Sequence, residues 1–177
     1  QHRMDLVDDH HLRGLQHLAR APGGEKQVER LGRRDEDVRR RLQHRLALVP
    51  TLKLWKYVTQ GAPDPSIGEQ MLQNGIAQLR DVSQEGGQIL FGTDVGFMGD
   101  YDPTHEYVFM ARAVLTPMQI LKALSTAPAA LFKEGDRRGR VEVGMDADLV
   151  VLGADPAENV RNFIDVRYTI RQGKVIY

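Results

Sequence analysis

Asp94 follows the apolar run Ile89-Leu90-Phe91, and its type and position make it the strongest candidate for chemistry in this sequence. Three consecutive apolar residues bracketed by glycines are typical of a short strand buried on both faces, as in a parallel sheet. Folds built on parallel sheets place their ligands beyond the carboxyl ends of the strands. A carboxylate there can bind a metal ion, accept a proton from water, or cap the next turn. The residues alone leave these three roles open.

Histidines could also bind a metal, and five of the six histidines lie within residues 1–46. The run Asp8-Asp9-His10-His11 resembles a ligand cluster in composition only, because adjacent side chains point apart on a helix or a strand. The sequence contains neither an H-x-H pair nor an H-E-x-x-H pattern. We therefore interpret these histidines as solvent-exposed side chains.

The segment before Asp94 has the pattern of a strand, a helix and a second strand. The run Leu46–Leu52 predicts a buried strand, and residues 53–64 predict a loop. Ser66 and Glu69 form a capping-box pattern ahead of apolar residues at helical spacing, which predicts a helix over about 66–85. Two buried strands joined by a helix make one right-handed crossover unit.

The segment after Asp94 predicts helices first and strands later. A helix should open at His105-Glu106, and Thr116 with Gln119 forms a second capping-box pattern next to Pro117. A short further turn should run from Thr126 to Phe132. Towards the end of the chain, apolar residues alternate with polar ones, which predicts strands near residues 141–143, 149–152, 166–171 and 174–177.

An ordered set of motifs resembles the metal-dependent amidohydrolases, close to the imidazolonepropionase and prolidase-like branch. The motifs are Gly92-Thr93-Asp94, a loop with His105-Glu106, Leu115-Thr116-Pro117, and the tail from Gly144 to Leu152. The resemblance covers about residues 47–177 and implies an α/β fold. Residues 47–134 would be the C-terminal fragment of a (β/α)8 TIM-like barrel, and residues 135–177 the C-terminal strands of a small β-sandwich. Such a sandwich is normally completed by strands from the chain's beginning, so an open sheet edge would favour self-association.

The resemblance also implies a reaction: metal-dependent hydrolysis of C–N bonds in small-molecule amides, cyclic amides or dipeptide-like substrates. Asp94 matches the position of a family aspartate that binds metal and takes the proton of the attacking water. His105 matches a loop histidine that would face the substrate. The implied cofactor is a divalent metal, with zinc expected first. A catalytic zinc typically has three protein ligands, and only Asp94 carries over, so we expect a truncated chain that is inactive by itself.

Residues 1–46 differ in composition from the rest of the chain. They hold 11 basic and 8 acidic side chains and contain no Ser, Thr, Ile, Asn, Phe, Tyr or Trp. Three interpretations stay open: a solvated, partly helical arm, an Arg-rich arm for nucleic acid, and out-of-frame translation of GC-rich DNA. The interspersed acids and the lack of aromatic residues for base stacking argue against nucleic-acid binding.

Bulk properties set the remaining expectations. The 177 residues include no cysteine, which excludes disulfides and cysteine zinc sites, and the net charge is zero. No apolar run approaches the roughly 20 residues that span a bilayer, so a soluble, cytoplasmic protein without membrane contacts is expected. The alternative function is a non-catalytic α/β module whose basic arm binds an acidic partner. A His-x-His strand encoded upstream would favour the enzyme over this module.

Overall fold

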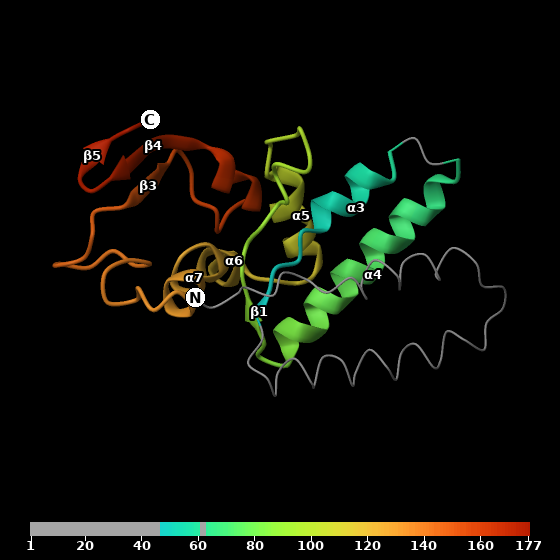
Figure 1. Cartoon of the computed structure of the whole chain (residues 1–177), viewed down its shortest axis with the longest axis horizontal. Coiled ribbons are helices and arrows are strands. Elements are labelled where there is room, and N and C mark those ends of the chain that lie inside the picture. The colour runs from blue at the N-terminus through green and yellow to red at the C-terminus, as the bar shows by residue number, and fades with distance from the viewer. Residues whose placement is uncertain (1–46, 61–62) are drawn as a thin grey trace, which may run out of the picture. The chain divides into compact units, whose positions relative to one another are not determined.

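The computed structural model describes residues 47–60 and 63–177 (Figure 1). Predictions for residues 1–46, including the start of the first predicted strand at Leu46, lie outside the described residues. Within the described ranges, no helix is both long enough and apolar enough to cross a membrane.

The two strands that flank the predicted crossover pair in parallel. β1 (Ala47–Leu48) lies beside β2 (Gln88–Ile89), with Ala47 opposite Gln88 and Leu48 opposite Ile89. The Leu90 amide extends this pairing by donating to the Leu48 carbonyl at 2.9 Å. The parallel arrangement was predicted, although both strands are shorter than their apolar runs.

A helix stands where the sequence predicted a loop. α3 (Leu52–Val58) follows β1 directly, and residues 53–64 are therefore only partly a loop. Thr51 precedes the helix in a left-handed conformation, with φ 43°, and provides no side-chain cap. The loop prediction was wrong because the cap comes from a residue distant in sequence, Glu106, which accepts hydrogen bonds from the first two helical amides.

The predicted long helix is present as α4 (Pro65–Gln84), but its start differs from the prediction. Asp64 is the N-cap, and its Oδ1 accepts the Ser66 amide at 2.9 Å. Ser66 therefore lies inside the helix, and the predicted capping box with Glu69 was wrong. The buried face of α4 supplies much of the core, through Leu72, Ile76, Leu79 and Val82.

Three shorter helices follow Asp94: the two that were predicted, and a third where a short turn was predicted. They are α5 (Thr104–Arg112), α6 (Pro117–Leu124) and α7 (Thr126–Leu131). The capping box at the start of α6 is confirmed, because Thr116 accepts the Gln119 amide while the Gln119 side chain accepts the Thr116 amide at 2.8 Å. Met110 of α5 and Ile120 of α6 are fully buried in the core with the α4 side chains.

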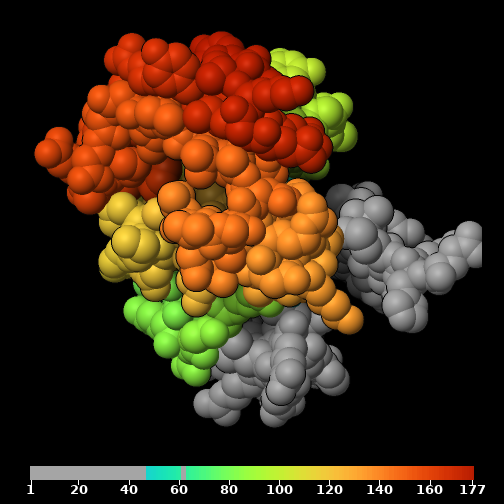
Figure 2. All heavy atoms as spheres, turned by 90° about the vertical axis from the view of Figure 1, so that its left-hand side faces the viewer, coloured from blue at the N-terminus to red at the C-terminus, as the bar shows by residue number. Residues whose placement is uncertain are grey.

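The last part of the chain forms a three-stranded antiparallel sheet. β4 (Val166–Arg171) lies between β3 (Leu149–Leu152) and β5 (Lys174–Val175), and the 3-10 helix η1 (Val160–Ile164) precedes β4. Figure 2 shows the C-terminal residues, in red, beside the orange segment that joins α7 to β3. Phe163 of η1 connects this sheet to the helices, because its ring stacks on the Tyr107 ring of α5 with 5.1 Å between the ring centroids.

The strand predicted near residues 141–143 is absent. Val141 and Val143 are almost completely exposed, and Gly144 turns the chain with φ 91°. Alternation of apolar and polar residues makes a strand only where a neighbouring strand accepts its hydrogen bonds, and no described strand pairs with this segment. The architecture is mixed α/β, while the complete barrel and sandwich stay predictions.

Candidate functional site

Asp94 lies beyond the carboxyl end of β2 and faces solvent. Its backbone adopts φ 58°, and its carbonyl accepts the amides of Phe97 and Met98, each at 3.3 Å. Its carboxylate forms no hydrogen bond or ion pair with another described residue. Asp94 therefore shapes the following turn through its backbone, and its side chain is exposed.

His105 lies in the first turn of α5, half-buried. Its Nε2 is 2.9 Å from Lys56 Nζ on α3, and its ring lies 5.7 Å from the Phe109 ring. An ammonium group can only donate, so Nε2 is the acceptor in this contact. Burial first, and the positive charge of Lys56 second, hold the pKa of His105 below its ordinary value. The neutral imidazole is thus favoured.

Glu106, the next residue, is a buried acid whose role the sequence did not reveal. It is 0 % exposed, and its Oε1 and Oε2 accept the amides of Leu52 and Lys53 at 2.9 and 2.7 Å. Burial raises the pKa of Glu106 to about 7, against the opposing effect of these two hydrogen bonds. One signal was present: Glu106 precedes the buried Met110 and Ala113 by four and seven positions, the spacing of one helix face.

Lys53 is buried beside Glu106's contacts and binds the loop that follows Asp94. Its side chain is 3 % exposed, and Nζ donates to the carbonyls of Asp100 at 2.8 Å and Asp102 at 2.5 Å. The same ammonium forms an ion pair with the Asp100 carboxylate at 2.9 Å. The hydrogen bond from Lys53 lowers the pKa of Asp100, and hydrogen bonds from Thr104 lower the pKa of Asp102.

The described residues do not form a complete metal site. Among residues 47–60 and 63–177, no group of three or more His, Cys, Asp or Glu side chains could hold a metal ion. A catalytic zinc usually has three protein ligands and an open position. Asp94 is the one predicted metal ligand, and His105, the predicted substrate-facing residue, contacts Lys56. These residues therefore do not fit a bound metal by themselves.

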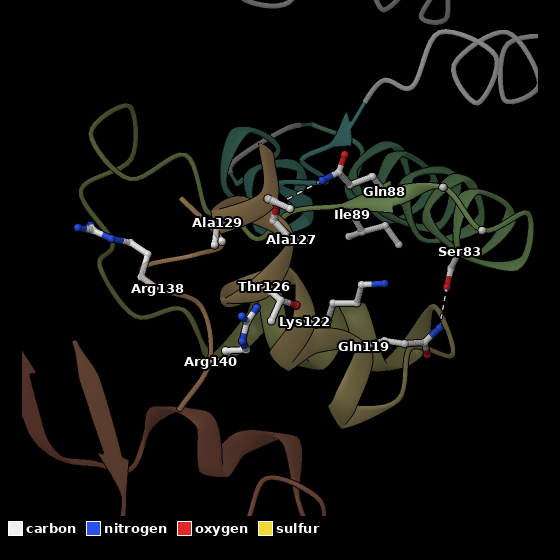
Figure 3. A pocket seen from close by; sticks show the side chains of 14 residues that line it. Ser83, Gln88, Ile89, Gln119, Lys122, Thr126, Ala127, Ala129, Arg138 and Arg140 are labelled. Carbon is white, nitrogen blue, oxygen red and sulfur yellow. Dashed lines mark hydrogen bonds between the residues drawn. The ribbon is translucent and has the colours of Figure 1, made fainter. Parts of the chain in front are cut away.

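A cavity of about 600 Å³ lies away from Asp94. Figure 3 shows Lys122 and Gln119 of α6 facing Ile89 of β2 across it. Gly86, Gly87 and Gln88 line the cavity at the start of β2, whereas Asp94 follows the end of that strand. Neither Asp94 nor His105 contributes to its lining. The predicted site residues thus lie outside this cavity.

Comparison with known proteins identifies the family. The sequence matches the amidohydrolase family over residues 7–177. The chain belongs to the amidohydrolase family. This membership confirms the resemblance found in the motifs, and the amidohydrolase family typically uses a divalent metal. The matched range includes most of residues 1–46, whose separation from the rest stays a prediction. No curated protein sequence matches the chain.

Solved structures share the fold of this amidohydrolase chain. A Xaa-Pro dipeptidase with bound methionine aligns with a TM-score of 0.69 and 22% identity over 79% of this chain and 36% of its own. A putative prolidase from Bifidobacterium longum aligns with a TM-score of 0.62 and 26% identity, over 75% of this chain and 35% of its own. A prolidase complexed with N-methylphosphonate-L-proline aligns with a TM-score of 0.63 and 22% identity, over 78% of this chain and 36% of its own. The amidohydrolase chain therefore spans about a third of the length of these structures.

Proposed function

We propose that this chain is the C-terminal part of a hydrolase that cleaves C–N bonds in small-molecule, dipeptide-like or cyclic amides. The observation that carries the proposal is the position of Asp94, an exposed carboxylate beyond the carboxyl end of β2 in a parallel strand pair. Ligand sites of α/β folds form at that end of the strands. Membership of the amidohydrolase family supports the reaction class.

Asp94 is the proposed catalytic residue. A carboxylate within reach of an attacking water can accept its proton as a general base, and the Asp94 side chain is exposed. After C–N cleavage the same carboxyl group can return that proton to the leaving amine. We also assign to Asp94 the role of one ligand to a divalent metal, with zinc as the first candidate. The other ligands are expected from parts of the fold outside residues 47–177.

His105 is the proposed substrate-facing residue. Its ring lies at the start of α5, the helix reached by the loop after Asp94, and it is held by Lys56 and Phe109. The Lys56 ammonium beside the ring would suit a substrate carboxylate, as a free dipeptide has. Dipeptide-like substrates are also consistent with the Xaa-Pro dipeptidase and prolidase names of the similar structures. The basic arm of the alternative, non-catalytic module lies outside the described residues.

A chimera tests the proposal, because the chain spans only about a third of its structural relatives. Residues 47–177 would replace the matching part of the Bifidobacterium longum prolidase, which aligns over 35% of that chain. The chimera would be assayed against Xaa-Pro dipeptides and cyclic amides with added zinc or manganese. Asp94→Asn should lower kcat by about 100-fold or more, the usual contribution of a proton-transfer group.

The matched control is Asp136→Asn, which removes an exposed carboxylate from the turn after α7. This variant should keep the activity of the unsubstituted chimera. Circular dichroism and gel filtration would establish that each chimera is folded. A folded but inactive chimera, or full activity in Asp94→Asn, would contradict the proposed function.

A further inference from the structure

The loop of residues 95–103 joins the two proposed site residues, Asp94 and His105, but contributes little to the core. Phe97 and Tyr101 are largely exposed, and Met98 is the one buried hydrophobic side chain of this segment. Such a loop has few apolar contacts to fix its conformation. Its conformation therefore depends on polar contacts, some within the loop and some with Lys53 of α3.

Lys53 holds the far end of this loop. A lysine ammonium has three hydrogens to donate, and here it meets three oxygens: the carbonyls of Asp100 and Asp102 and the Asp100 carboxylate. With 3 % of the side chain exposed, water cannot readily replace these contacts. Losing the ammonium would leave two partly buried loop carbonyls without this donor, which is costly.

Glu106 caps the N-terminus of the same helix. It belongs to α5, yet its carboxylate accepts the first two amides of α3, including the amide of Lys53 itself. Lys53 thus binds Glu106 through its backbone and the loop through its side chain. One helical turn later, Lys56 contacts His105. The start of α3 is therefore the common attachment for the loop, for α5 and for the His105 ring.

We propose that Lys53 and Glu106 form a buried clasp that positions the loop 95–103 and the start of α5, and so fixes His105 relative to Asp94. Both are positioning residues, since neither side chain reaches solvent where a substrate would bind. The clasp is a structural contact that exists whatever reaction the protein catalyses. Only its effect on catalysis, through His105 and Asp94, rests on the proposed function.

Hydrogen exchange on the full chain tests the clasp without any assay of activity. Lys53→Met and Glu106→Gln would be compared with the matched exposed variants Lys122→Met and Glu85→Gln. We expect the amides of residues 95–103 to exchange about 10-fold faster or more in both clasp variants, as expected for a lost buried polar contact. Amides in the buried face of α4 should change much less, and the control variants should match the unsubstituted chain.

The titration of His105, followed by NMR, is the readout that a general loss of stability would not produce. Lys56, Lys53, Asp100 and Asp102 set the electrostatic surroundings of the ring. If the clasp positions His105, then Glu106→Gln should move its pKa towards the ordinary histidine value while the protein stays folded. The Glu85→Gln control should leave the titration unchanged.

Unchanged exchange in residues 95–103 for both clasp variants would overturn the proposal. Should a clasp variant fail to fold, Asp100→Asn decides, because it removes the negative charge that pairs with the Lys53 ammonium while an amide oxygen at the same position can still accept the Asp102 amide. Faster exchange confined to the loop in Asp100→Asn supports the clasp, and unchanged exchange overturns it. Failure of the proposed hydrolysis would appear only in the chimera assays, so the two failures are distinguishable.

Discussion

The Glu106 carboxylate accepts the backbone amide of Lys53 at 2.7 Å, across 53 positions of sequence. Through this contact a side chain of α5 caps α3, and the capped residue binds the loop between β2 and α5. Helix N-termini leave amides without intrahelical partners, and here a distant acid supplies the acceptor that the local sequence lacks. The surroundings of the proposed site are therefore organised by tertiary contacts.

Glu106 should make stability depend on pH in a defined direction. Its pKa is about 7 in the folded protein and about 4.5 when unfolded. Between these values the folded state retains a proton that the unfolded state releases. The contribution of Glu106 to the free energy of unfolding is therefore full below pH 4.5 and is lost as pH rises through 7. The loss should be about 3 kcal/mol, at about 1.4 kcal/mol per pKa unit.

Urea unfolding of the unsubstituted chain and of Glu106→Gln between pH 4.5 and 8 measures this contribution as a difference. His105, whose pKa is lowered, acts in the opposite direction below its ordinary titration range. Because Glu106→Gln is expected to shift this pKa, the His105 titration measured by NMR in each protein gives its share of the difference, which is subtracted. The difference in unfolding free energy should shrink as pH rises. A difference that is constant with pH would show that the Glu106 carboxyl group titrates normally.

The two capping-box patterns should respond differently to alanine. Thr116→Ala removes a real cap from α6 and should lower the free energy of unfolding by about 1 kcal/mol. Ser66→Ala should change it by less than about 0.5 kcal/mol, because Ser66 lies inside α4 and Asp64 is the cap. Denaturant unfolding of the two variants checks this order. Equal losses would contradict the observed helix start.

The chain by itself should bind zinc only weakly. The described residues include no group of three metal-binding side chains, and one exposed carboxylate cannot replace the water ligands of zinc. Isothermal titration should give a dissociation constant above the micromolar range. Asp94→Asn should leave the heat of binding unchanged. A micromolar or tighter site that disappears in Asp94→Asn would show that this chain assembles a metal centre.

Local signals in the sequence determined much of the chain's secondary structure. Thr116, Pro117 and Gln119 fixed the start of α6, since a capping box and a first-turn proline act within a few residues. Apolar residues at helical spacing predicted α4, and period-two alternation predicted β4. The ordered motifs predicted the family. In each case the interacting groups are close in sequence, so their pattern is readable without the fold.

Tertiary structure decided the features whose partners are distant in sequence. α3 lacks a local cap and is capped by Glu106, so residues 53–64 read as a loop. The alternation at Val141 and Val143 predicted a strand that has no described neighbour. Burial of Lys53 and Glu106 could not be read from charged residues, which are ordinarily exposed. Only the fold brings each of them to the oxygens or amides that offset the cost of removing a charge from water.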